Sequence, residues 1–149
     1  MIILIFLIWI RENEGQFNLQ PGQWSGGTSM GLCIADSLLI NNGIIDPHDL
    51  IMRFIAWMLG GYNNTFRFNE KYGLLPRESV GLEENISRAL YFYFRYRSVE
   101  TLIGNKDTSG KGSIIRNAAI PICFHYDIAL ACEMARKQSL TTYQGLEAR

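Results

Sequence analysis

The sequence has no surplus of either charge sign. Lysine plus arginine and aspartate plus glutamate each number 14 among 149 residues, so the formal net charge is zero. A chain without a net field is not recruited electrostatically to nucleic acid or to an anionic membrane surface. Charged residues make up 19% of the chain and hydrophobic residues 48%, which excludes a disordered tail protein and predicts one globular domain.

Metal-ligating side chains are also scarce. The three cysteines, Cys33, Cys123 and Cys132, form no Cys-x-x-Cys pair, and neither His48 nor His125 has a Cys or His at ligand spacing. This argues against a zinc-type site and a disulfide framework. We expect the thiols to be small buried hydrophobic groups in a reducing compartment, the cytoplasm. The histidines are expected at the surface or at helix caps.

No hydrophobic run is long enough to cross a bilayer. Residues 1–10 are apolar, but a spanning helix needs about 20 such residues. The run also has neither the basic segment nor the small-residue cleavage site of a signal peptide. We treat residues 1–16 as an apolar N-terminal segment, predicted to be a buried helix or strand, and residues 17–149 as the domain proper. The alternative is that this end is an artefact of the gene model or of truncation.

Alternating strand patterns and internal repeats are missing too. The residues that begin and end the apolar segments are those typical of helix ends. Thr28 or Ser29 is predicted to cap the first helix, Asp46 the second and Asp127 the last. The expected helices cover about residues 30–42, 50–59, 83–96, 114–119 and 128–138, and residues 141–148 are expected to begin another. Residues 62–81 are interpreted as a long connection. We therefore predict an all-α fold.

Apolar residues at helical spacing predict which faces of these helices are buried. In the expected helices at residues 83–96 and 128–138, the side chains predicted to face inward are Ile86, Leu90, Tyr93, Phe94, Ile128, Ala131, Cys132 and Ala135. The aromatic run at residues 91–96 covers most of a helix circumference, so core packing explains part of it and the remainder is available to a partner.

One stretch is more informative than any other. Residues 23–39 read Gln-Trp-Ser-Gly-Gly-Thr-Ser-Met-Gly-Leu-Cys-Ile-Ala-Asp-Ser-Leu-Leu. This resembles the signature of the ADP-ribosylglycohydrolase family, which usually has two adjacent aspartates after the serine or threonine. Three further segments, at residues 46–57, 110–121 and 135–148, resemble later family motifs in the same order. In the last of them Tyr143 stands where histidine is usual.

The resemblance implies a truncated ADP-ribosylglycohydrolase-like domain whose fold is a compact all-α one. Known members use magnesium to hydrolyse the bond between ADP-ribose and a protein side chain or related acceptor. The metal-binding aspartates correspond to Gly26 and Gly27, which have only backbone oxygens, while Ser25 keeps a residual hydroxyl. The family's downstream acidic cluster has no counterpart in these residues. We therefore expect no catalytic residue, no bound cofactor and a hydrolase-like protein without hydrolytic activity.

The best remaining candidate for ligand binding consists of Gly110, Lys111, Gly112 and Ser113. The family counterpart of this loop lines the ADP-ribose pocket, and backbone amides at a helix start suit a pyrophosphate. The resemblance thus implies weak binding of ADP-ribose or of an ADP-ribosylated protein. The alternative is a flexible turn in which Ser113 caps the helix that follows.

Two other functions stay open at this stage. The true gene product could be longer and active, with the metal held by the acidic cluster alone. The chain could instead be a non-catalytic helical adaptor that pairs with a partner or a fuller homologue. Uncovered apolar faces would then favour self-association.

Overall fold

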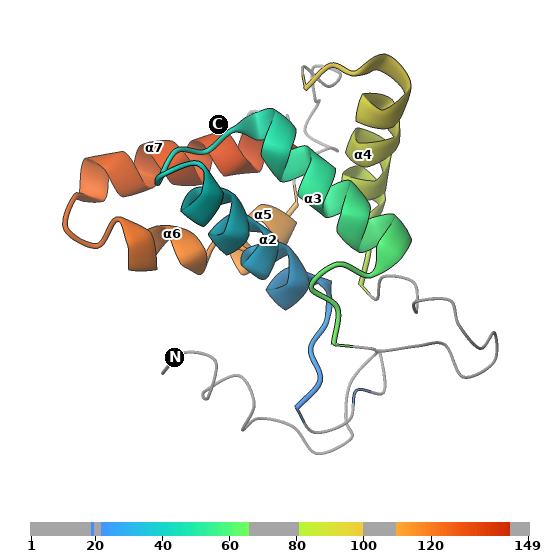
Figure 1. The fold of residues 1–149 in the computed structure, drawn as a ribbon, viewed down its shortest axis with the longest axis horizontal. Helices are drawn as coiled ribbons and strands as arrows, with labels where there is room; N and C mark the ends of the chain where they lie inside the picture. Colours follow the sequence, from blue (N-terminus) through green and yellow to red (C-terminus); the bar gives the residue numbers. More distant parts are fainter. Residues whose placement is uncertain (1–18, 20–21, 66–80, 100–109, 144–149) are drawn as a thin grey trace.

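The computed structural model describes residues 19, 22–65, 81–99 and 110–143, and all regular structure in them is helical (Figure 1). The prediction of an all-α fold is confirmed. The helices are α2 (Gly26–Ile40), α3 (Pro47–Gly60), α4 (Glu84–Tyr96), α5 (Gly112–Ile115), α6 (Ala119–Cys123) and α7 (Ile128–Leu140). None of these helices is long and apolar enough to cross a membrane.

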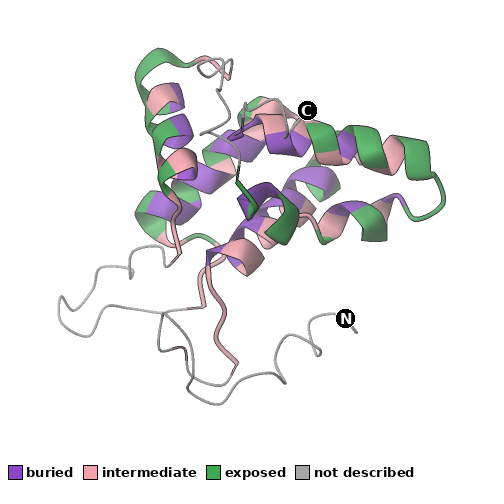
Figure 2. Ribbon diagram, turned by 180° about the vertical axis from the view of Figure 1, so that it is seen from behind, coloured by how far each residue is buried: buried purple, intermediate pink, exposed green. Residues whose placement is uncertain are grey.

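Helices α2 and α3 form an antiparallel pair at the centre of the molecule, and α7 and α6 lie beside them (Figure 1). The predicted cap of α3 is confirmed, because the Asp46 carboxylate accepts hydrogen bonds from the backbone N–H groups of His48 and Asp49. The buried side chains of the two helices meet in one apolar core, purple in Figure 2. Its fully buried members include Ile34, Leu50 and Phe54.

The start of α2 differs from the prediction. Ser25 is the N-cap residue, and Thr28 and Ser29 lie inside the helix, where their backbone N–H groups donate to the Ser25 carbonyl. The prediction that Thr28 or Ser29 caps the helix is therefore wrong. The carbonyl of an N-cap residue accepts the first hydrogen bonds of the helix, so the two glycines form its first turn.

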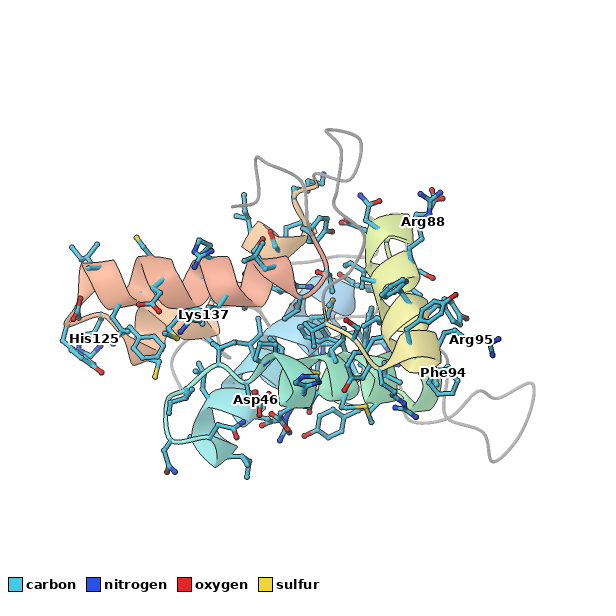
Figure 3. The ribbon with its side chains drawn as sticks, turned by 90° about the horizontal axis from the view of Figure 1, so that it is seen from above. Asp46, Arg88, Phe94, Arg95, His125 and Lys137 are labelled. Carbon is cyan, nitrogen blue, oxygen red and sulfur yellow. The ribbon has the colours of Figure 1, made fainter. Side chains whose placement is uncertain are left out.

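Helix α4 packs on α3 through Ile86, Leu90 and Tyr93, as expected, but Phe94 is 55% exposed. Figure 3 shows Phe94 and Arg95 on the outer side of the helix. An aromatic run of this length surrounds the helix, whereas α3 covers only one face. The inward assignment of Phe94 is wrong for that reason.

The segment after residue 110 forms more helices than predicted. In place of one stretch at 114–119 there are two short helices, α5 and α6. Pro121 is the third residue of α6, where its missing N–H group has no helical partner to lose. Asp127 caps α7 as predicted, with its carboxylate accepting from the Leu130 N–H.

The buried face of α7 is made by Met134, Gln138 and Ser139. Ile128 is 80% exposed and Cys132 is also exposed, so both inward predictions are wrong. Of the three thiols only Cys33 is buried. The apolar segment at residues 1–16 and the helix predicted to begin at 141–148 lie outside the described residues, apart from the turn that ends at Tyr143.

Candidate functional site

The candidate site begins at the N-terminus of α2. Ser25 precedes the helix in extended conformation, and its side chain makes no capping hydrogen bond. Gly26 is buried and Gly27 is half-buried. Of these three residues only Ser25 has a side-chain oxygen, whereas magnesium is usually held through carboxylates.

Gly27 is in close contact with α5. A Cβ atom added at Gly27 would lie 2.4 Å from the Cγ2 methyl of Ile115, closer than two carbon atoms can approach. The space where an aspartate side chain would begin is therefore taken by Ile115. Together with the absence of carboxylates at positions 26 and 27, this means that the described residues of this site do not fit a magnesium ion.

The same contact brings two sequence motifs together. Ile115 ends α5, which begins within the glycine loop, defined here as residues 110–113. The loop therefore lies next to the start of α2, although about eighty residues separate the two segments. Gly110 and Lys111 are exposed, and Gly112 and Ser113 are buried. Ser113 lies inside α5, whose N-cap residue is Lys111, so Ser113 does not cap this helix.

The buried side of the glycine loop rests on Tyr143. A Cβ atom at Gly112 would lie 2.2 Å from the Tyr143 hydroxyl oxygen, and one at Gly110 would lie 2.7 Å from the ring atom Cε1. Only glycine permits this approach. The Tyr143 hydroxyl donates a hydrogen bond to Oε2 of Glu83, with 2.5 Å between the oxygens. Burial and the Glu83 carboxylate raise the pKa of the Tyr143 hydroxyl.

Arg116 follows the loop and is completely buried. Its Nε donates to Oε1 of Gln138 at 2.8 Å, and its Nη2 donates to the Gln138 carbonyl at 2.9 Å. The guanidinium lies 4.7 Å from the ring centre of Phe54 and 5.8 Å from that of Tyr143. Burial lowers the pKa of Arg116 to about 10. Because its donors point into the protein, Arg116 has a structural role: it fixes the loop to α7.

Gln138 completes this anchor. Its side-chain Nε2 donates to the Ser113 carbonyl at 3.0 Å, while its Oε1 accepts from Arg116. One buried amide thus satisfies a carbonyl inside α5 and the guanidinium of the residue that follows α5. Helix α7 contacts the buried side of the loop through Gln138. Lys111 of the loop remains exposed to solvent.

The other polar residues considered in the sequence lie elsewhere. The Asp36 carboxylate accepts from the Tyr62 hydroxyl at 2.7 Å and from Asn63 Nδ2 at 2.8 Å, so it joins α2 to the end of α3. His48 Nδ1 lies 3.1 Å from the Tyr93 hydroxyl oxygen, and His125 Nδ1 lies 3.1 Å from the Ile122 carbonyl oxygen. Among the described residues no three His, Cys, Asp or Glu side chains form a group that could hold a metal ion.

Two residues of this site were not assigned a role from the sequence. Tyr143 was noted as a replacement for histidine, and Glu83 was expected only as the first residue of a helix. The two are 60 residues apart and share no local pattern. The tyrosine substitution was the one signal available, while nothing in the sequence indicated Glu83 as its partner.

Comparison with known proteins identifies the family. The model of the ADP-ribosylglycohydrolase family matches residues 5–148, so this chain belongs to that family. It is 28% identical over 136 residues to the ADP-ribosylarginine hydrolase Tri1 of Serratia proteamaculans (strain 568). It is 27% identical over 134 residues to the protein of the same name in Pseudomonas putida (strain GB-1). Each alignment covers 90% of this chain.

The chain spans about a third of the length of these curated relatives, 34% of the first and 33% of the second. Their names state that they are hydrolases of ADP-ribosylarginine. The predicted family membership is thereby confirmed.

Proposed function

We propose that this chain is a non-hydrolysing member of the ADP-ribosylglycohydrolase family that retains weak binding of ADP-ribose. The observation that supports the loss of activity most directly is the contact between Gly27 and Ile115. Position 27 has no carboxylate, and the Cγ2 methyl group of Ile115 occupies the place of the first side-chain carbon. A metal-activated water needs several oxygen ligands in fixed geometry, and Ser25 by itself does not supply them.

Retained binding is supported by the glycine loop. Its buried side is fixed by Tyr143, Arg116 and Gln138, and Lys111 is exposed. A loop that is already ordered loses little conformational entropy when a ligand binds. A lysine ammonium on such a loop suits the pyrophosphate of ADP-ribose as a point charge. Binding of this kind requires neither a metal ion nor the aspartates.

Calorimetric titration with ADP-ribose, with and without magnesium, tests the proposal. We expect weak binding that magnesium does not change, and a reduction of about tenfold or less when Lys111→Ala removes one exposed charge pair. Lys137→Ala is the matched control, because Lys137 pairs with Glu133 on α7 and lies outside the loop (Figure 3). Binding that requires magnesium would refute the inactive assignment. No binding under either condition would refute the retained site.

One observation favours a second candidate function, the helical adaptor. Large apolar side chains are exposed at the end of α2 and at the start of α7, including Leu39 at 78%, Ile40 at 70% and Ile128 at 80%. Where such side chains form one contiguous patch, they mark an interaction face. Sedimentation velocity distinguishes the two functions, since self-association that ADP-ribose leaves unchanged would favour the adaptor, and a stable monomer would count against it.

A further inference from the structure

A single contact joins three segments that are distant in the sequence. Tyr143 lies in the turn that follows α7, Glu83 lies directly before α4, and Gly110 and Gly112 lie between them in the chain. The Tyr143 side chain is fully buried and the Glu83 side chain is half-buried. Their hydrogen bond therefore forms at the back of the glycine loop, on the side away from exposed Lys111.

The Glu83 side chain contacts the glycine loop and does not cap its own helix. Glu83 is the N-cap residue of α4, and its side chain makes no capping hydrogen bond. Its Oε2 accepts from the Tyr143 hydroxyl and lies 3.0 Å from the place where a Cβ of residue 112 would be. A hydrogen bond to a carboxylate is charge-assisted and stronger than one between neutral groups.

The Tyr143 hydroxyl contacts both Glu83 and the glycine loop. It donates to Glu83, and the position of a Cβ on Gly112 lies 2.2 Å from the same oxygen. The hydroxyl thus lies between the carboxylate and the backbone of the loop. Since Gly110 and Gly112 have no side chains, this hydroxyl and the ring beneath it determine how close the loop can approach α7.

We propose that Tyr143 and Glu83 are positioning residues, which hold the glycine loop in the conformation that binds ADP-ribose. The identity of the ligand in this inference rests on the proposed function. The role of Tyr143 and Glu83 in fixing the loop does not depend on any ligand. Ordering a residue costs conformational entropy. A loop fixed before binding does not incur this cost when the ligand arrives.

Hydrogen exchange measures the loop without a ligand. The backbone N–H groups of Ile114 and Ile115 donate to the Lys111 carbonyl, and that of Arg116 donates to Gly112, so their protection reports the loop conformation. We expect Tyr143→Phe to speed exchange at residues 114–116 about tenfold, because one hydrogen bond to a charged group is lost while the ring remains. Tyr126→Phe is the control, since the Tyr126 ring is exposed and contacts His125.

Glu83 variants distinguish positioning from general stability. Glu83→Ala should speed exchange as Tyr143→Phe does, and Glu83→Gln should restore protection because an amide oxygen still accepts from the hydroxyl. In titrations with ADP-ribose, affinity should fall about tenfold in Glu83→Ala and in Tyr143→Phe. In Glu83→Gln it should return to the wild-type value. Equal exchange in the wild type and Tyr143→Phe would overturn the proposal.

The two proposals fail in different ways. If the wild type binds no ADP-ribose, the proposed function is refuted and the exchange data alone decide whether Tyr143 and Glu83 position the loop. If the wild type binds and Tyr143→Phe binds equally well, the positioning role is refuted and the proposed function stands. Uniformly faster exchange over α2, α3 and α7 in both variants would show a loss of global stability and would also overturn the positioning role.

Discussion

Single side chains decide what the candidate site can do. Gly27 has no carboxylate, and Ile115 approaches it so closely that even a Cβ atom does not fit. Ile115 is β-branched and lies in a helix, which restricts rotation of its side chain. The apolar character of this site therefore involves two positions, one on α2 and one on α5. We expect that replacing the glycines alone does not create an acidic site.

The first prediction concerns this pair. Gly27→Asp should destabilise the chain by about 1–3 kcal/mol, because overpacking forces Ile115 out of its place. Ile115→Ala in the same chain should recover most of that loss, whereas Ile114→Ala should not, because only Ile115 lies within 4 Å of a Cβ at position 27. Urea unfolding of the single and double variants measures the coupling. Additive effects of Gly27→Asp and Ile115→Ala would contradict the contact.

Some of this residue-level detail can be predicted from the sequence and some cannot. The replacement of both aspartates is visible because residues 23–39 match a family motif. The contacts of Gly27 with Ile115 and of Tyr143 with Glu83 are not visible, since each joins residues with a large separation in the chain. Short-range patterns contain no information about such pairs.

Individual helices follow the local rules of capping and periodicity to different degrees. Asp46 and Asp127 cap α3 and α7 as predicted, because a cap depends on neighbouring residues only. The buried faces were predicted less well. Phe94 and Ile128 are apolar residues at helical spacing, yet both are exposed, because no neighbouring helix in the described residues covers them. Periodicity gives the spacing of a face, while tertiary packing determines whether it is buried.

The second prediction concerns Cys33 on the buried face of α2. Burial raises the pKa of this thiol from 9.0 to about 12. Between these values the unfolded chain binds fewer protons than the folded one, so stability is fully present below about pH 9 and falls as pH rises. The loss should be on the order of 1 kcal/mol at about pH 10. The interval from about pH 9 to about pH 10 isolates Cys33, because the effects of Tyr143 and Arg116 begin near its upper limit.

Urea unfolding at about pH 8 and about pH 10 checks this prediction. Cys33→Ala should remove most of the difference in stability between the two pH values. Cys132→Ala is the matched control and should retain the difference, because Cys132 is exposed in both states. Iodoacetamide labelling of the folded chain should modify Cys132 and spare Cys33. A Cys33 thiol labelled as fast as Cys132 would contradict its burial.

At the scale of the whole molecule, the described part is a helical core that carries the glycine loop. Large apolar side chains are exposed at the end of α2 and at the start of α7. The chain matches the family over almost its entire length, while it spans only about a third of the curated relatives. The all-α class could be predicted from helix-capping residues, from helical spacing of apolar residues and from the family motifs. Which apolar surfaces are exposed could not, because that depends on how α2, α6 and α7 pack together.

The described part of this family member has an intact helical scaffold around a candidate site without carboxylates. The helices that position the candidate site have caps and a common core, and the loop next to α2 is anchored by buried Arg116 and Gln138. Positions 26 and 27, at the start of α2, are both glycine. A protein of this kind is expected to bind the ligand of its relatives without cleaving it.

Release of ADP-ribose from an arginine-ADP-ribosylated protein, measured with and without magnesium, tests this account most directly. The hydrolase of Serratia proteamaculans serves as the active control on the same substrate. We predict that the wild-type chain releases no ADP-ribose above the buffer rate under either condition. Magnesium-dependent release by this chain would contradict the account, because it would require a metal site that Ser25, Gly26 and Gly27 do not provide.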